Sequence, residues 1–474
     1  MSDLGFDVVV VGGGLAGLTC ANRCAEQGLS VALLERGTDE RYLCNSRISM
    51  GYINCAFEYM LGERTELRRA IESSTRGYAD PELAEIFADN GAAAVRWLAS
   101  QGVRFIKGGW QSGQRLMLAP PVPYRMGLNW QGRGGDTTVF RLGARLVERG
   151  AQLMRGVAAR ELVVEDRRCT GVIATRRRDT LRIAARAVLL ADGGYQANID
   201  LLKKYTAARP ERLLQRNAKT GIGDGLMMAE AAGARLRGTD RFYGHVQSID
   251  ALTNPSLWPY PIADNPMCAG ITVNAAGRRF ADEGLGGVFM ANAIAALEDP
   301  QEAVTVFDQR IWETAGKIGA RPANPLLEKA GATLHRSDTL ADLAQRAGLS
   351  SEALSATVSA HNRAVESGVF DTLDPPRTDG PANRAQAIKV PPFYALPLCA
   401  GITYTMGGVA IDGQCRVQHA EGGVIAGLYA AGSTTGGHEG GPVAGYTGGL
   451  GKAATFGWHS GNCIAAALTS SPGA

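Results

Sequence analysis

The sequence predicts an α/β fold with a parallel sheet at its core. Three observations favour this fold, and they follow one another at the start of the chain. Four consecutive valines, Val8 to Val11, are typical of a buried parallel strand. Residues 15–27 show a helical pattern with one apolar stripe, and residues 30–34 form a second apolar strand. Strand, helix and strand in this order indicate a βαβ unit, whose two strands lie parallel.

A glycine-rich turn, Gly12-x-Gly14-x-x-Gly17, joins the first strand to the first helix. Gly12 allows a tight turn, Gly14 lets a pyrophosphate approach the backbone, and Gly17 lets the helix pack closely on the strand. The first turn of the helix, with Leu15 and Ala16, offers free N–H groups and a partial positive charge to the phosphates. The turn therefore predicts a dinucleotide site. The alternative is a βαβ unit with an ordinary glycine turn.

Glu35 ends the second strand, 18 residues after the last glycine of the turn, where a carboxylate can accept hydrogen bonds from a ribose. This acid completes the pattern of a Rossmann-like domain, in which we expect Glu35 and the adjacent Arg36 to contact the cofactor. Asn45, Ser46 and Ser49 follow in the next polar stretch. These short side chains could meet a second phosphate, or they could belong to an ordinary surface loop.

The α/β pattern continues after this unit. The expected elements are a helix over 81–101, an irregular loop over 106–136, a helix over 137–149, strands over 152–164, 171–175 and 186–190, and a helix over 226–232. The last of these strands runs into a second glycine turn, Ala191-Asp192-Gly193, which is again suited to backbone contact with a cofactor.

Residues 238–388 differ in character from the sequence on either side. They begin with aromatic residues among prolines, continue with predicted helices over 300–367, and end in a stretch rich in Pro, Asp and Arg. The sequence from residue 389 onward is again Gly-rich and strand-like. We therefore predict a discontinuous dinucleotide-binding domain, residues 1–237 and 389–474, with an inserted domain of residues 238–388.

Composition narrows the classes of function. Hydrophobic residues make up 45% and charged residues 20% of the chain, and the net charge of +3 is too small to indicate a nucleic-acid partner. Nine scattered cysteines without a C-x-x-C pair favour a reducing cytoplasm and no metal site. Residues 1–6 are too short and polar for a targeting segment. No run of about 18 apolar residues occurs, so no transmembrane segment is expected.

Several segments in combination identify a family. Besides the first turn and Glu35 they are Ala191-Asp192-Gly193-Gly194, Thr220–Gly225, Val273-Asn274-x-x-Gly277-x-x-Phe280-x-Asp282-Glu283, Pro392-Phe393-Tyr394, Thr405-Met406-Gly407-Gly408 and Gly427–Gly432. The chain resembles, over nearly its whole length, the flavoprotein family of fumarate reductase and succinate dehydrogenase. That family includes 3-ketosteroid 1-dehydrogenases and tricarballylate dehydrogenase. The resemblance implies FAD and an FAD domain built from both chain ends, with an α+β capping domain inserted between them.

The same resemblance implies further contacts to FAD. Val157, Gly432, Ser433, Gly449 and Leu450 occupy segments that would approach the cofactor. At Ser433 the family usually has a Glu that contacts the ribityl chain, and a hydroxyl can still form a hydrogen bond there. The covalent His of succinate dehydrogenases is absent, because no His precedes residue 245. We therefore expect FAD to be bound without a covalent link.

The chain departs from fumarate reductases where those enzymes bind and protonate a dicarboxylate. They carry an Arg soon after the Asp-Glu pair, but residues 284–291 here contain none. They place a His pair near the Thr-Met-Gly-Gly motif, where this chain has Thr403-Tyr404, and an Arg before a Gly-Gly pair, where it has Tyr446. A Tyr cannot make the bidentate, charge-assisted contact of an Arg. Reduction of a C4-dicarboxylate is therefore not expected.

Residues 445–451 instead resemble the Tyr-and-glycine segment of the ketosteroid and tricarballylate dehydrogenases. In the ketosteroid enzymes this Tyr and a nearby backbone N–H bind the ketone oxygen. The resemblance implies that Tyr446 donates to a developing enolate, together with the N–H of Leu450 or Gly451. The alternative is a Tyr that packs under the flavin. Tyr404 would be the base or a second donor, or only a wall of the pocket.

Three further residues are weaker candidates. Tyr260 is a possible catalytic residue of the insert, and Tyr124, in the long loop, a possible substrate contact. His438 could hold a substrate carboxylate, relay a proton, or be a loop residue whose ring is satisfied by the backbone.

These features predict an FAD-dependent desaturase that introduces a C=C bond α,β to a ketone in a ring. The α-proton goes to a base and the β-hydride to flavin N5. Candidate substrates are small ring keto acids, such as 4-oxocyclohexanecarboxylate, and 3-ketosteroids. The chain is somewhat short for a steroid enzyme of this family, which favours the smaller ring. The electron acceptor could be oxygen, a quinone or an electron-transfer protein. The alternatives are an ene-reductase that acts on an enoate or enone, and a flavin electron carrier without its own substrate.

Overall fold

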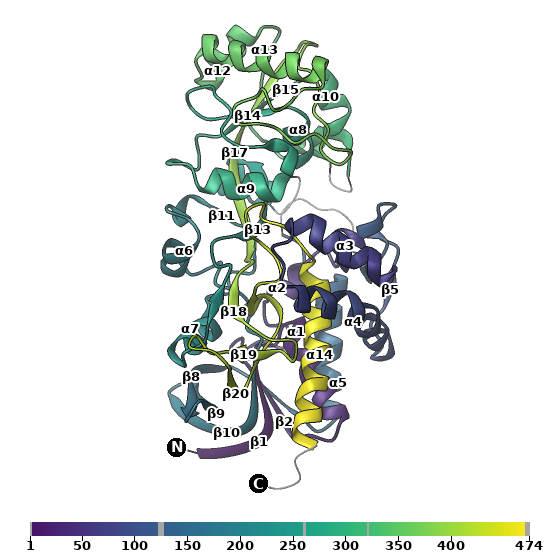
Figure 1. Ribbon diagram of the computed structural model, residues 1–474, viewed down its shortest axis with the longest axis vertical. Coiled ribbons are helices and arrows are strands. Elements are labelled where there is room, and N and C mark those ends of the chain that lie inside the picture. The colour runs from purple at the N-terminus through teal and green to yellow at the C-terminus, as the bar shows by residue number, and fades with distance from the viewer. Residues whose placement is uncertain (1, 122–127, 259–261, 320–321, 470–474) are drawn as a thin grey trace.

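A computed structural model describes residues 2–121, 128–258, 262–319 and 322–469 (Figure 1). The molecule is elongated. Both chain ends lie at one end of the long axis, and helices from the middle of the chain lie at the other.

An eight-stranded sheet forms the core of the end that holds both termini. Its strands come from two separate stretches of the chain, residues 2–190 and 416–430. In spatial order the strands are β19 (Arg416–Gln418), β20 (Val424–Ala430), β9 (Arg168–Arg176), β10 (Asp179–Leu190), β1 (Ser2–Val11), β2 (Val31–Glu35) and β7 (Gln152–Arg155), with β8 (Val157–Glu165) paired to β9. β20, β10, β1, β2 and β7 run parallel. The predicted α/β fold with a parallel core is confirmed.

Helix α14 (Gly449–Thr469) packs along α1 (Leu15–Glu26) beside this sheet (Figure 1). Our strand-like interpretation of the sequence after residue 389 is wrong for this segment, which forms a 21-residue helix. Its glycines serve close packing rather than turns. A Cβ at Gly457 would lie 2.5 Å from the Ala16 carbonyl oxygen, and one at Gly461 would lie 2.7 Å from Arg23 Cβ.

A second, six-stranded sheet carries the other end of the molecule. It consists of β11 (Leu214–Gln215), β17 (Phe393–Thr405), β15 (Val304–Asp308) and β14 (Ile271–Val273), with β13 (Phe242–Ser248) and β16 (His335–Ser337) also paired to β17. The 13-residue strand β17 runs from this end towards the first sheet (Figure 1). Both β11 and β17 lie outside the predicted insert, and the apolar core here extends from Tyr195 to Ile402. The boundaries at 238 and 388 stay a prediction.

Further helices and strands complete the described fold. The helices are α2 (Asn45–Ile48), α3 (Arg64–Thr75), α4 (Pro81–Ser100), α5 (Gly134–Glu148), α6 (Ile199–Tyr205), α7 (Asp224–Ala231), α8 (Asp264–Ala269), α9 (Gly287–Ala295), α10 (Gln309–Glu313), α11 (Ala323–Lys329), α12 (Leu340–Ala347) and α13 (Ser351–Ser367). The remaining strands are β3 (Asn54–Cys55), β4 (Glu58–Tyr59), β5 (Phe105–Ile106), β6 (Met117–Leu118), β12 (Leu236–Arg237), β18 (Gly408–Ala410) and β21 (Thr435–Gly436).

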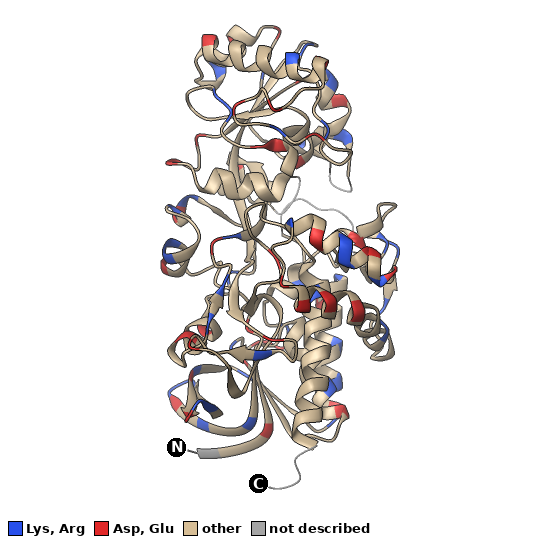
Figure 2. Cartoon of the chain, in the orientation of Figure 1, with Lys and Arg blue, Asp and Glu red and all other residues tan. Residues whose placement is uncertain are grey.

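The distribution of charge matches the small net charge. Figure 2 shows acidic and basic residues interspersed, for example on α3. All nine cysteines are free thiols. Within the described residues, no cluster of His, Cys, Asp or Glu has the make-up of a metal site. No helix in that part of the chain combines the length and the apolar character needed to cross a membrane.

Candidate functional site

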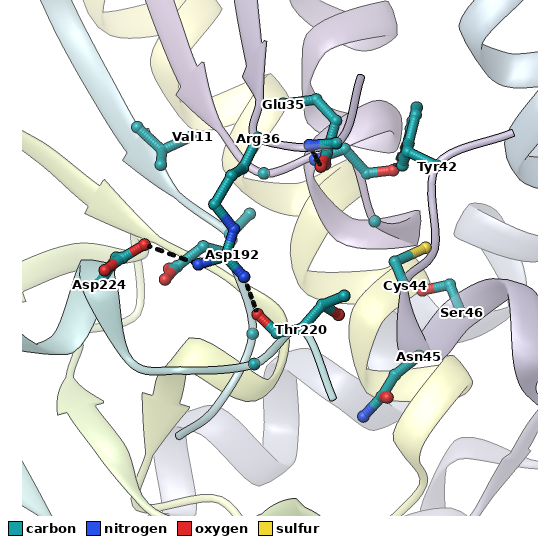
Figure 3. Close-up of a pocket in the computed structure, with 18 of the residues that line it drawn as sticks. Val11, Glu35, Arg36, Tyr42, Cys44, Asn45, Ser46, Asp192, Thr220 and Asp224 are labelled. Atoms are coloured by element: carbon teal, nitrogen blue, oxygen red, sulfur yellow. Dashed lines mark hydrogen bonds and ion pairs between the residues drawn. The ribbon is translucent and has the colours of Figure 1, made fainter. Parts of the chain in front are cut away.

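A cavity of about 420 Å³ opens where β1 and β2 end, at the glycine turn (Figure 3). Ligands of open α/β sheets bind at this edge, beyond the carboxyl ends of parallel strands. Most of the residues that we predict to contact the cofactor line this cavity: Gly12, Gly14, Leu15, Ala16, Glu35, Arg36, Asn45, Ser46, Val157, Ala191, Asp192, Gly193, Gly432 and Ser433. Gly17, Ser49, Gly449 and Leu450 are not among the lining residues.

The glycines of the turn divide into two kinds. Gly12 has a φ of +103°, and a Cβ there would lie 2.6 Å from the Ala191 carbonyl oxygen. A Cβ at Gly17 would lie only 2.0 Å from the Gly12 carbonyl oxygen, so these two glycines permit close packing. At Gly14 the nearest heavy atom to a Cβ is Ser46 Oγ at 3.5 Å, which leaves this residue open towards the cavity.

The N-terminus of α1 also lines the cavity, through Gly14, Leu15 and Ala16. The Leu15 N–H donates to Ser46 Oγ at 3.0 Å, and Ser49 Oγ in turn donates to the Ser46 carbonyl oxygen at 2.9 Å. A helix N-terminus carries partial positive charge, and its first N–H groups have no partner within the helix. An open glycine edge beside such a terminus fits the pyrophosphate of a dinucleotide.

Glu35 is held by the turn itself. Its Oε2 accepts from the Gly13 N–H at 2.9 Å, and its Oε1 accepts from the Gly37 N–H at 2.6 Å. Burial raises the pKa of this carboxyl above its ordinary value, although both backbone contacts oppose the shift. The acid therefore fixes the shape of the turn and still faces the cavity, where its contact with a ribose stays a prediction.

Two polar side chains tie the cavity walls together. Arg36 donates to the Thr220 carbonyl oxygen at 2.8 Å and lies 3.4 Å from Asp224 Oδ2 (Figure 3). The Asn45 amide donates to the Thr403 carbonyl oxygen at 2.9 Å and accepts from the Ala218 N–H at 2.8 Å. Both residues thus connect the first 50 residues to segments far along the chain.

Asp192, in the second glycine turn, lies against the N-terminus of α7. Its Oδ2 accepts from the Gly225 N–H at 2.7 Å, and Thr434 Oγ1 lies 3.3 Å from its Oδ1. Burial raises its pKa to about 6. The turn at 191–193, the helix α7 and the segment after β20 therefore meet at one wall of the cavity.

A second cluster of residues contains two of the three predicted catalytic tyrosines, Tyr404 and Tyr446. Tyr243 on β13 stacks on Tyr404 of β17, with ring centroids 5.1 Å apart, and on Tyr446, with centroids 4.5 Å apart. Phe57 packs against Tyr446 at 4.7 Å. The fold thus brings together Tyr404 and Tyr446, which are 42 residues apart in the sequence.

Tyr446 precedes the N-terminus of α14. Its hydroxyl oxygen accepts from the Gly449 N–H at 3.1 Å, and its carbonyl oxygen accepts from Ser74 Oγ at 2.6 Å. Burial raises the pKa of its phenol above the ordinary value. Leu450 and Gly451 lie in the first turn of α14, whose initial N–H groups have no partner within the helix.

Tyr404 lies next to a buried ion pair. Its hydroxyl donates to Glu439 Oε2 at 3.2 Å, and Glu439 Oε1 pairs with Lys452 Nζ. Both charged side chains are fully buried. Burial and the Glu439 carboxylate hold the pKa of Tyr404 well above its usual range, because a nearby negative charge disfavours a phenolate. Of the two predicted catalytic roles, this environment favours a hydrogen-bond donor over a base.

His438 is buried against the rings of Phe87 and Phe456, with centroids 4.9 Å and 5.3 Å away. Neither ring nitrogen has a hydrogen-bond partner among the described residues, so the backbone does not satisfy this ring. Burial and Lys452 hold its pKa well below the usual range. A neutral imidazole is a poor partner for a carboxylate. Tyr124 and Tyr260, the other two candidates, lie outside the described residues.

Sequence reasoning gave no role to four residues around these tyrosines. Glu439 follows His438 directly, and Lys452 is a charge on a mostly apolar helix, which could have pointed to a buried pair. Tyr243 and His245 are two residues apart on one strand, a spacing that places side chains on the same face.

Comparisons with known proteins agree with this geometry. Residues 7–448 match the model of a family described as FAD binding domain. An NADH:acrylate oxidoreductase of Vibrio harveyi is 28% identical over 408 residues, which cover 82% of this chain; the chain spans only 37% of that relative's length. A 4-oxocyclohexanecarboxylate 2-dehydrogenase of Sinomonas cyclohexanicum is 28% identical over 559 residues, covering 97% of this chain and 93% of the relative. The crystal structure of 3-ketosteroid Δ1-dehydrogenase from Sterolibacterium denitrificans has the same fold, with a TM-score of 0.75 and 20% identity over 98% of this chain and 100% of that one.

The predicted resemblance is confirmed: this chain belongs to the FAD binding domain family of flavoprotein oxidoreductases, which includes dehydrogenases and reductases that act on CH–CH groups.

Proposed function

We propose that this protein is an FAD-dependent dehydrogenase that introduces a C=C bond α,β to the ketone of a cyclic substrate. The substrate class is a small ring keto acid, such as 4-oxocyclohexanecarboxylate, or a 3-ketosteroid. The proposal depends mainly on one observation: the Tyr446 hydroxyl lies at the N-terminus of α14, Tyr243 stacks on Tyr446, and Tyr404 stacks on Tyr243. The Sinomonas relative, a ring-ketone dehydrogenase, supports the same class.

Removing two hydrogens next to a ketone needs a donor to the developing enolate, an acceptor for the α-proton and an acceptor for the β-hydride. Bound FAD supplies the hydride acceptor. Tyr446 donates to the ketone oxygen: its own oxygen accepts from Gly449, so its proton is available, and its raised pKa keeps that proton in place. The N–H of Leu450 or Gly451, at the same helix terminus, is the second donor.

FAD is held without a covalent link in this proposal. The cavity residues of the two glycine turns hold the pyrophosphate, and Glu35 accepts from the ribose. Ser433 donates to the ribityl chain, and Gly449 and Leu450 approach the flavin from α14. The protein acts in the reducing cytoplasm, in keeping with nine free thiols.

An ene-reductase is the second candidate, because the Vibrio relative is an acrylate oxidoreductase and the chemistry is reversible. The direction then depends on the electron partner, which could be oxygen, a quinone or an electron-transfer protein. A pure electron carrier fits less well, because a carrier needs an exposed flavin edge. The second sheet carries Tyr243 on β13 and Tyr404 on β17, and would therefore cover that edge.

The test is anaerobic reduction of the purified holoprotein. We expect yellow protein whose flavin is released by acid and whose visible absorbance is bleached by cyclic ketones but not by succinate. Tyr446→Phe removes one donor to the enolate and slows bleaching by about 100-fold or more. Tyr205→Phe is the control, because its hydroxyl bonds to Glu230 at the surface.

Three outcomes would contradict parts of this proposal. Protein purified without flavin would exclude the cofactor assignment. Bleaching by succinate, or by no ketone of the panel, would exclude the ring-ketone reaction. An unchanged bleaching rate in Tyr446→Phe would remove Tyr446 from the mechanism and leave the reaction in place.

A further inference from the structure

We propose that Tyr243 is the acceptor of the substrate α-proton, and that His245 and Asp264 keep it poised for that role. This inference rests on the proposed ketone dehydrogenation and identifies the base that the reaction requires. Sequence reasoning named Tyr446, Tyr404 and Tyr260 for catalysis and gave Tyr243 no role.

The three side chains form a hydrogen-bonded chain. The Tyr243 hydroxyl lies 2.9 Å from His245 Nε2, and His245 Nδ1 lies 2.6 Å from Asp264 Oδ2. Asp264 Oδ1 accepts from the Val246 N–H at 2.9 Å, which fixes the carboxylate. Because a carboxylate only accepts, Nδ1 carries the imidazole proton, and Nε2 is left to accept from the phenol.

A glycine leaves the space that the Asp264 carboxylate of these three side chains occupies. A Cβ at Gly287 would lie 2.0 Å from Asp264 Cγ and 2.1 Å from its Oδ2. Gly287 lies in the segment 284–291, where the fumarate-reductase pattern has an Arg proton donor and this chain has none. The carboxylate of Asp264 thus fills room that any side chain at Gly287 would take. The segment without this Arg therefore packs directly against Asp264 of the Tyr-His-Asp chain.

Tyr243 lies where an α-proton acceptor is needed. Its ring stacks on both Tyr404 and Tyr446, and of these two rings Tyr446, the proposed enolate donor, is the nearer. A carbon next to a carbonyl held by Tyr446 is therefore close to the Tyr243 face of the site. Tyr404, by contrast, donates to the Glu439 carboxylate, which makes it a poor base.

The proposed step is a proton transfer without net redox change. The α C–H bond breaks, and its electron pair stays on the substrate as the enolate that Tyr446 stabilises. The proton moves to the Tyr243 oxygen as the phenol proton moves to His245 Nε2. The resulting imidazolium is stabilised by the Asp264 carboxylate, so no free phenolate has to form.

The test combines Tyr243→Phe with His245→Gln and Asp264→Asn. Tyr243→Phe keeps the ring stack and removes only the hydroxyl. Tyr394→Phe is a matched control: its hydroxyl also bonds to a side chain, Gln309, and its ring also stacks, on Phe307 at 5.4 Å. The readouts are ketone affinity, the anaerobic rate of flavin bleaching, and the isotope effect with ketone deuterated only at the α-carbon.

We expect Tyr243→Phe to bind ketone with affinity within about threefold of wild type and to be bleached about 100-fold more slowly or worse. The α-deuterium isotope effect should rise, because proton transfer becomes rate-limiting. His245→Gln and Asp264→Asn should lose less rate but also raise the α-deuterium effect, with partial recovery in Asp264→Glu. A purely structural role would lower the rate without that rise. In ¹⁵N-labelled protein, the His245 ring should carry its proton on Nδ1.

Each result decides one point. Unchanged bleaching and isotope effect in Tyr243→Phe, with wild type active, would overturn the role of Tyr243 alone. If that variant loses its flavin, the isotope effects of His245→Gln and Asp264→Asn decide in its place. An Nε2-protonated His245 would overturn the relay. Wild type bleached by no cyclic ketone would overturn the proposed function, and this inference with it.

Discussion

The buried ion pair between Glu439 and Lys452 predicts a large and specific effect on stability. Both side chains are fully buried, and Glu439 also accepts from Tyr404 at 3.2 Å and from the Thr447 N–H at 3.4 Å. Lys452→Met keeps most of the volume but removes the only cation paired with Glu439 among the described residues. An uncompensated buried charge costs about 3–5 kcal/mol. We expect the free energy of unfolding to fall by that amount.

The double variant Lys452→Met/Glu439→Gln separates charge from packing. An amide keeps hydrogen-bonding capacity without the charge, and a buried pair replaced as a whole is often close to neutral. We expect it to recover most of the loss, leaving about 1 kcal/mol. Lys317→Met is the matched control, because Lys317 pairs with Glu313 on the surface and such pairs contribute about 0–1 kcal/mol.

The assay is denaturant unfolding of the flavin-free and flavin-bound protein, followed by circular dichroism. A loss below about 1 kcal/mol in Lys452→Met, or an equal loss in the double variant, would refute the reasoning from buried charge. The first result would mean that Glu439 is solvated or protonated in the fold. The second would mean that the lost methylene packing of Lys452, rather than its charge, sets the cost.

Two further predictions concern the glycine turn and helix α13. Gly17→Ala places a Cβ 2.0 Å from the Gly12 carbonyl oxygen, so α1 must shift. Flavin content after purification and the melting temperature should both fall, and the free energy of unfolding should fall by about 1–3 kcal/mol. In the control Gly28→Ala nothing lies within 4 Å of the new Cβ but φ is +81°, so the variant should lower stability and leave flavin content intact. Burial lowers the pKa of His361 from 6.5 to about 4, so its contribution to stability is present above pH 6.5 and is lost as the pH falls through 4. Relative to His361→Gln, whose amide can still donate to the Gln386 carbonyl oxygen, wild type should lose about 3 kcal/mol between about pH 7 and pH 4; parallel pH curves would contradict this.

The first βαβ unit was predictable because its signals are local. Four valines, three spaced glycines and a terminal Glu specify a strand, a turn and a helix without help from distant residues. The structure adds what is not local. Glu35 turns back to the N–H groups of Gly13 and Gly37, and Ser46 accepts from the first N–H of α1. Those contacts depend on which segments the tertiary fold brings together, and the periodicity of the sequence does not predict this.

The catalytic end was predictable only in part. The resemblance points to Tyr404 and Tyr446, since both occupy motif positions. The environment of each comes from tertiary packing: Glu439 and Lys452 meet through the start of α14, which the glycine-rich sequence concealed. Asp264 reaches His245 from a helix 19 residues away, and only the packed structure shows that Gly287 makes room for it.

The most direct test of the account is the product of a single anaerobic turnover. Holoprotein mixed with a cyclic ketone that bleaches its flavin should yield one equivalent of the α,β-unsaturated ketone per flavin, identified by mass spectrometry and NMR. Tyr446→Phe should form it at least about 100-fold more slowly. Flavin that stays oxidised with every cyclic ketone of the panel, or bleaching without an enone product, would contradict the proposed dehydrogenase.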